Sequence, residues 1–164
     1  MDSAVETVSQ FLPENTVVFR SVGRDAAKVS EVRTRRHAAP LRDLPMAVLI
    51  NEFTASSAEI MTGALKDHGR AVVVGARSFG KGAIQQLQML PNGGSVRYTS
   101  AHYRTPAGHQ IDGRGIVPDV EVKVSTRDTF LLMRAMMGAG KGPAIPDRAL
   151  EKAAALLREG RDGK

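Results

Sequence analysis

The chain has 164 residues, of which 42% are hydrophobic and 24% charged, with a formal charge of +6. This length and composition favour one globular domain and argue against disorder. Without cysteine the chain can form no disulfide or thiolate metal site, and its four histidines lack the spacing of a zinc site. We therefore expect no metal and no cofactor. No apolar run reaches the roughly 18 residues of a membrane-spanning helix.

The first third of the chain predicts a helix followed by a hairpin. Residues 1–12 place apolar side chains at three- and four-residue spacing, which is typical of an amphipathic helix. Residues 16–37 have β-branched and aromatic side chains near a glycine-containing turn, which predicts a β-hairpin.

The next segments alternate strand, helix and strand. Residues 46–50 form a continuous apolar run, typical of a central parallel strand buried on both faces. Residues 56–68 have one apolar face and precede Gly69, which suits the position after a helix. Residues 70–74 predict a second buried strand. This order indicates an α/β domain with a parallel crossover.

The second half predicts more strands and then helices. Residues 83–90 and 95–103 are expected to pair across a turn, and residues 120–124 to form one further strand. Amphipathic helices are expected at 128–137 and 146–158. We therefore divide the chain into a core, residues 1–124, and a C-terminal helical extension, residues 125–164.

The positive charge is scattered along the chain. The densest cluster consists of Arg33, Arg35, Arg36 and His37, beside Arg20, Arg24 and Lys28. One basic face built from this cluster would suit nucleic acid or anionic lipid. Only 4% of residues are aromatic, however, so stacking platforms for bases are scarce. A solvated arginine-rich surface is the simpler interpretation, and we expect no nucleic-acid partner.

Ser56 stands where a predicted buried strand meets a predicted helix. A helix N-terminus offers free N–H groups and the positive end of the helix dipole, which both favour a developing oxyanion. Ser56 is therefore a candidate nucleophile. The alternative is that Thr54, Ser56 or Ser57 only caps the helix, with Glu59 completing a capping box with Ser56. The local sequence by itself favours the cap.

Lys81 lies between Gly80 and Gly82 in a predicted loop. A serine nucleophile needs a base, and a lysine can serve when burial keeps its amine neutral. Gln85, four residues further on, would face the same side of an extended strand and could orient the amine, or it could be a surface glutamine. The loop is also similar to a phosphate loop, but it lacks the serine or threonine that should follow the lysine.

Together these segments resemble the C-terminal processing (tail-specific) serine proteases. The motifs are LINEFTASSAEI (49–60), FGKG (79–82), YRTPAG (103–108), GRGIVPD (113–119) and DRALEKA (147–153). In that family the base lies 25 positions after the nucleophile and a glutamine follows 4 positions later, which is the spacing of Ser56, Lys81 and Gln85. The resemblance favours a nucleophilic role for Ser56, which is compatible with capping.

The resemblance implies a fold, an activity and a location. The fold would be α/β, with a ClpP/crotonase-like core of strand–strand–helix units, an added β-hairpin and C-terminal helices. The activity would be that of a serine endopeptidase that cleaves unfolded proteins or peptides near or from their C-terminus. The backbone N–H of Ser57 would be one oxyanion donor. Glu59, on the next helical turn after Ser56, would either support the site from behind or only cap the helix. Family members usually act in the periplasm or cell envelope, some of them at the membrane.

The sequence departs from the family pattern in two ways. Residues 54–58 read TASSA, so the small residues after the nucleophile are exchanged. The family also carries a PDZ domain and a glycine turn that supplies a second oxyanion N–H, and we expect this chain to begin just past that turn. Losing one oxyanion donor typically slows catalysis about a hundredfold or more. The alternative function is therefore a catalytically incomplete fragment or pseudo-protease that binds peptides or partner proteins.

Overall fold

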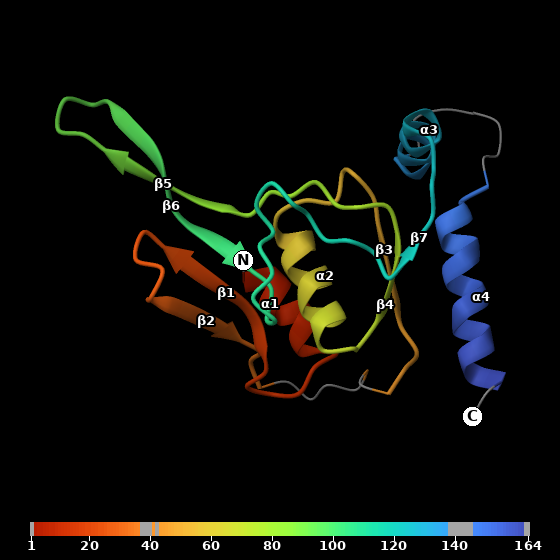
Figure 1. The fold of residues 1–164 in the computed structure, drawn as a ribbon. Helices are drawn as coiled ribbons and strands as arrows, with labels where there is room; N and C mark the ends of the chain where they lie inside the picture. The colour runs from red at the N-terminus through yellow and green to blue at the C-terminus, as the bar shows by residue number, and fades with distance from the viewer. Residues whose placement is uncertain (1, 37–40, 42, 138–145, 163–164) are drawn as a thin grey trace.

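The computed structural model describes residues 2–36, 41, 43–137 and 146–162. Within these residues two sheets alternate with helices in layers (Figure 1). The elements in chain order are α1 (Asp2–Ser9), β1 (Val17–Gly23), β2 (Val29–Arg33), β3 (Ala47–Ile50), α2 (Ser57–Asp67), β4 (Val72–Gly75), β5 (Ala83–Met89), β6 (Ser95–Arg104), β7 (Val120–Glu121), α3 (Thr126–Met136) and α4 (Arg148–Asp162).

The smaller sheet is parallel and has the order β3-β4-β7. The expected strand–helix–strand unit is confirmed as β3-α2-β4. Our expectation that residues 46–50 form a central strand buried on both faces is wrong, because β3 lies at the sheet edge and Leu49 is 41% exposed. Residues 120–124 contribute only the two-residue strand β7, which pairs with the end of β4.

The larger sheet is antiparallel and has the order β2-β1-β6-β5. Strands β1 and β2 form the hairpin expected at 16–37, of which residue 37 lies outside the described residues. Strands β5 and β6 form a long hairpin that projects from the body, with most of its side chains exposed (Figure 1). Strand β5 is one of the two edge strands of this sheet, so one row of its backbone groups faces outward.

Helix α2 packs between the two sheets and forms the centre of the core. It contacts β1 on one side and β4 on the other, and α1 packs against it (Figure 1). Its apolar stripe is buried as expected at Ile60, Ala64 and Leu65. On the larger sheet, Tyr103 packs edge-to-face on Phe19 with ring centroids 5.2 Å apart, and burial raises the pKa of the Tyr103 phenol. These contacts hold the two sheets around one helix.

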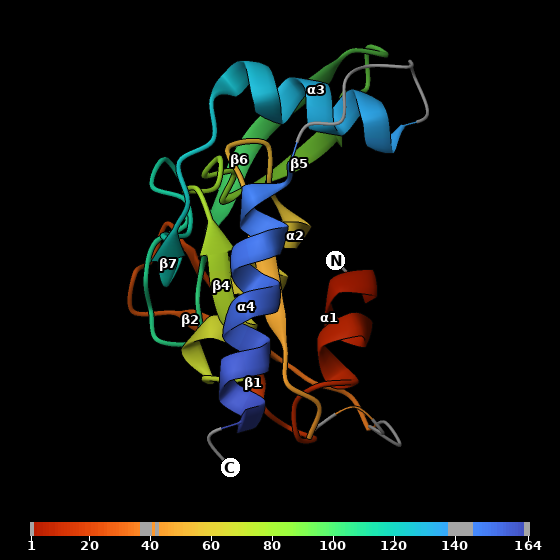
Figure 2. The ribbon, with the colours of Figure 1, turned by 90° about the vertical axis from the view of Figure 1, so that its right-hand side faces the viewer.

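The two C-terminal helices expected from periodicity are present as α3 and α4, and the segment 138–145 between them lies outside the described residues. Helix α4 packs against β3 and β4, on the face of the sheet opposite α2 (Figures 1 and 2). The domain boundary at residue 124 stays a prediction. In the described ranges no helix is long and apolar enough to cross a membrane.

Gly75 ends β4 where the chain turns toward the Lys81 loop. Its φ is +133°, and a Cβ there would collide with the carbonyl oxygen of Ile50 on β3. We predict that Gly75→Ala lowers the free energy of unfolding by about 3 kcal/mol, because strain and overpacking add. Urea denaturation measures this change.

Gly69 is the matched control for that substitution. Its φ is +61°, but nothing lies within 4 Å of the position of a Cβ. Gly69→Ala therefore tests the left-handed backbone alone and should cost about 1 kcal/mol. Equal losses from the two substitutions would contradict the collision with β3.

Candidate active site

Ser56 occupies a strained turn between β3 and α2. The turn begins where β3 ends, with the Thr54 N–H donating to the Asn51 carbonyl at 2.9 Å and the Asn51 N–H to Thr54 Oγ1 at 3.0 Å. Ser56 then has φ 58° and ψ −120°, an uncommon backbone conformation for a residue other than glycine. Strain of this kind costs about 1–3 kcal/mol and is concentrated at functional sites.

The N-terminus of α2 presents an N–H group beside Ser56. The next three amides of the helix, those of residues 58, 59 and 60, donate to the carbonyls of Ala55 and Ser56. Ser57 is the first helical residue, so its N–H has no acceptor within the helix. Among the described residues no other acceptor meets it, and its role as an oxyanion donor stays a prediction.

Glu59 is completely buried and accepts four hydrogen bonds. Its Oε2 accepts from the backbone N–H groups of Ser56 and Lys81, at 2.8 Å each. Its Oε1 accepts from the Gly80 N–H at 2.6 Å and from the Ser78 hydroxyl at 2.5 Å. The Ser56 and Lys81 backbone nitrogens each lie 2.8 Å from the same oxygen, so they are no further apart than twice 2.8 Å. Glu59 therefore joins the two candidate catalytic segments.

Of the capping box expected for Ser56 and Glu59, the hydrogen bond from the Ser56 N–H to the Glu59 carboxylate is present at 2.8 Å, whereas among the described residues no N–H donates a capping hydrogen bond to the Ser56 side chain. Sequence reasoning therefore found one partner of Glu59 and missed the other three. The missed residue with the largest role is Ser78, which is buried and also accepts from the Ile116 N–H at 2.6 Å. A serine in a glycine-containing loop gives no sequence signal for such a role, because its partners lie 19 and 38 residues away.

The two glycines that flank Lys81 are required by close backbone contacts. A Cβ on Gly80, which has φ +90°, would lie 2.9 Å from the Gly115 nitrogen. A Cβ on Gly82 would collide with the backbone of Asp112, and the Gly82 N–H donates to the carboxylate of that residue at 3.1 Å. Packing of the loop against residues 112–115 thus accounts for the two glycines of the Gly-Lys-Gly sequence.

Lys81 and Gln85 are both exposed. The described part of the chain therefore does not provide the burial that we expected to keep the Lys81 amine neutral. The spacing argument for Gln85 also has a weaker basis than expected, because β5 begins only at Ala83 and its pairing with β6 shifts register between Ile84 and Gln85. The structure brings the backbones of Ser56, Glu59 and Lys81 together, and the side-chain roles of Lys81 and Gln85 stay predictions.

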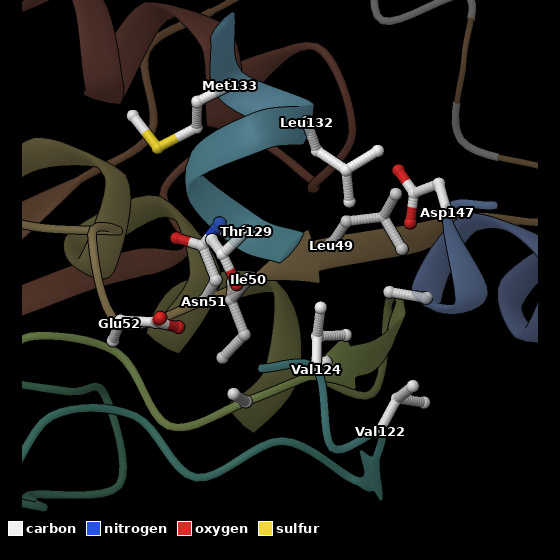
Figure 3. A pocket seen from close by; sticks show the side chains of 13 residues that line it. Leu49, Ile50, Asn51, Glu52, Val122, Val124, Thr129, Leu132, Met133 and Asp147 are labelled. Carbon is white, nitrogen blue, oxygen red and sulfur yellow. The ribbon is translucent and has the colours of Figure 1, made fainter. Parts of the chain in front are cut away.

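An apolar pocket opens at the carboxyl ends of β3 and β4, beside the turn that leads to Ser56 (Figure 3). Its volume is about 220 Å³. Ile50 of β3 and Val122, which follows β7, line it together with Leu132 and Met133 of α3, and Glu52 and Asp147 add carboxylates (Figure 3). Ligands of α/β proteins commonly bind at this edge of a parallel sheet. The lining suits an apolar side chain.

The arginine cluster of the first hairpin is largely paired with acidic residues. Arg20 and Arg33 share Glu31, at 3.1 and 2.6 Å, and Arg35 lies 2.6 Å from Asp2. The Arg35 guanidinium lowers the pKa of the Asp2 carboxyl. Of the cluster, His37 lies outside the described residues. In the described part of the chain no group of three or more histidines and carboxylates is placed to hold a metal ion.

The buried carboxylate of Glu59 gives a testable consequence. We predict that Glu59→Gln lowers the free energy of unfolding by about 3 kcal/mol, because the amide group of glutamine would face N–H donors and leave them unpaired. Urea denaturation measures the loss. Glu52→Gln makes the same chemical change on the neighbouring turn, where Glu52 forms no ion pair with any residue that the structure describes, and should change stability by less than about 0.5 kcal/mol. Similar losses from both substitutions would disprove the bridging role.

Comparison with known proteins relates this geometry to a family. Residues 1–122 match the model of peptidase family S41. A carboxyl-terminal-processing protease of Picosynechococcus is 41% identical over 119 residues, which cover 73% of this chain and 28% of the relative. A carboxy-terminal-processing protease of Bartonella bacilliformis is 37% identical over 99% of this chain and 38% of the relative. The chain thus spans well under half the length of these relatives.

Solved structures show the same relationship. The photosystem II D1 C-terminal processing protease aligns with a TM-score of 0.65 and 33% identity, over 74% of this chain and 31% of that one. The tricorn protease aligns with a TM-score of 0.53 over 94% of this chain and 13% of that one, and its 16% identity shows the fold alone. The expected α/β fold with a ClpP/crotonase-like core is confirmed. From the match over residues 1–122, the chain belongs to peptidase family S41.

Proposed function

We propose that this chain is the catalytic part of a serine endopeptidase that cleaves polypeptides near or from their C-terminus. Ser56 is the nucleophile, Lys81 its general base and Gln85 the residue that orients the amine. The observation that supports this most directly is the shared oxygen of Glu59, which joins the backbones of Ser56 and Lys81 although they are far apart in sequence. The names of the relatives agree with this proposal.

The reaction begins when the neutral Lys81 amine takes the proton of the Ser56 hydroxyl. The Ser56 oxygen attacks a peptide carbonyl, and the Ser57 N–H binds the oxyanion that forms. The C–N bond then breaks, the amine leaves with the proton that Lys81 returns, and an ester remains on Ser56. Water hydrolyses this acyl-enzyme, with Lys81 again acting as base, and the site is restored.

Because Lys81 is exposed, the proposed mechanism needs the substrate to shield the Lys81 amine from water. A lysine amine in water is protonated, so the base must be dehydrated before it can act. We propose that a bound polypeptide covers Lys81 and excludes water from it. The surface beside the site suits an apolar segment, because Phe53 and Phe79 are 48% and 66% exposed. Their two segments are joined by the hydrogen bond from the Phe79 N–H to the Thr54 carbonyl, at 2.9 Å.

Cleavage of an unfolded reporter protein with an apolar C-terminal tail tests this mechanism. We predict that Ser56→Ala and Lys81→Ala each reduce cleavage at least about a thousandfold, because nucleophile and base act as a unit. Ser57→Ala removes a neighbouring hydroxyl but keeps the backbone N–H, and should retain activity. Lys152→Ala, which removes an exposed lysine of helix α4, is the matched control for the base. Full activity of Lys81→Ala would refute the Ser/Lys mechanism.

The alternative function, an incomplete fragment or pseudo-protease, gives a different pattern. The folded chain would then not cleave the reporter, and labelling with a fluorophosphonate would decide between the two non-cleaving forms. Labelling at Ser56 that Lys81→Ala abolishes would indicate an intact Ser/Lys pair that lacks other parts of the machinery. The absence of labelling would favour a pseudo-protease. The extracytoplasmic location stays a prediction.

A further inference from the structure

A second hollow, on another side of α2, is lined by basic residues. Its volume is about 620 Å³, within the range of pockets that hold ligands larger than a single ion. Four basic side chains line it: Lys66 of α2, Arg77 of the loop before Lys81, Arg104 at the end of β6, and Arg114. They come from four separate segments that the fold brings together.

The acidic residues at this hollow are paired with groups other than its arginines. Asp119 pairs with Lys66 at 2.7 Å, which compensates the charge of that lysine. Asp67, the carboxylate among the lining residues, accepts from the Ala107 N–H at 2.7 Å and lies 3.8 Å from His109. In the part of the chain that the structure describes, no carboxylate pairs with the three lining arginines. The hollow therefore keeps a net positive charge.

Backbone carbonyls hold two of these arginines in place. Nη1 of Arg77 donates to the Arg114 carbonyl at 3.1 Å, and Nη1 of Arg104 donates to the Gly108 carbonyl at 3.2 Å. A carbonyl orients a guanidinium without neutralising its charge, and a guanidinium has five N–H donors. Each arginine therefore keeps donors for a ligand, and the planar guanidinium is well suited to binding a carboxylate through two hydrogen bonds.

One wall of the hollow contacts the loop that carries Lys81. The Gly113 N–H donates to the Gly80 carbonyl at 2.9 Å, and the Ile116 N–H donates to Ser78 Oγ at 2.6 Å. Arg77 and Arg114 lie on the two sides of this contact. A ligand that bridges them would hold together the two segments on which the position of Lys81 depends.

We propose that this basic hollow binds the carboxylates of an acidic polypeptide segment. Three uncompensated guanidinium groups specify an anion with several carboxylates, and the volume and the spread of the arginines over separate segments favour a peptide over a free phosphate ion. That the segment belongs to a substrate rests on the peptidase function proposed above, whereas the binding itself does not. The site would then give the enzyme a preference for polypeptides with acidic side chains.

Fluorescence anisotropy with a labelled peptide of four glutamates in a neutral background tests this site. The Ser56→Ala variant is used throughout, so that no peptide is cleaved. We expect the dissociation constant to be at least about tenfold lower than for the same peptide with glutamine in place of glutamate. This preference should shrink as ionic strength rises. The double variant Arg77→Gln/Arg114→Gln should lose it, while Arg97→Gln, on the projecting hairpin, should keep it.

Several results would overturn the proposal. These are equal binding of the glutamate and glutamine peptides, no binding of either, or equal weakening by Arg97→Gln. Displacement of the glutamate peptide by an equal concentration of inorganic phosphate would show a simple oxyanion site instead. The urea denaturation midpoint of each variant shows that it is folded. Because binding is measured without cleavage, a failure of peptidase activity and a failure of this site give separate results.

Discussion

The buried carboxylate of Glu59 is the interaction on which the arrangement of the site depends. Burying a charged group without partners is costly, and this carboxylate is stabilised by three backbone N–H groups and one hydroxyl. The donors come from the nucleophile turn and from the loop of Lys81. The same hydrogen bonds therefore satisfy the buried carboxylate and hold the Ser56 backbone next to that of Lys81. Neither the nucleophile turn nor the Lys81 loop can move without leaving buried polar groups unpaired.

The fold supports this interaction from both sides. Strands β3 and β4 run parallel, so their carboxyl ends lie together. The turn after β3 and the loop after β4 therefore leave the sheet at the same end. Helix α2 starts at this carboxyl end and is held between the two sheets. Its N-terminus and Glu59 are therefore directed toward the loop that carries Lys81. The strained backbone of Ser56, and the Ser57 N–H that meets no acceptor among the described residues, would suit the acyl-transfer site that we propose for this member of family S41.

The surroundings of the site divide into apolar and basic regions. The pocket between the small sheet and α3 is lined mainly by aliphatic side chains, whereas the hollow beside α2 collects arginines. The apolar pocket contacts the segment just before Ser56, and the basic hollow contacts the segment just before Lys81. A polypeptide that engages both regions would need apolar and acidic side chains, so the two regions together define what kind of segment the site would prefer.

The sequence by itself determined the helix of α2, the two hairpins and the spacing of Ser56, Lys81 and Gln85, because local periodicity, turn chemistry and motif order depend on neighbouring residues. Only the tertiary structure decided that β3 is an edge strand, that Gly80 and Gly82 pack against residues 112–115, and that Lys81 is exposed. It also showed that Glu59 has partners beyond Ser56. These features arise from contacts between residues that are far apart in the sequence, and no local sequence pattern specifies such contacts.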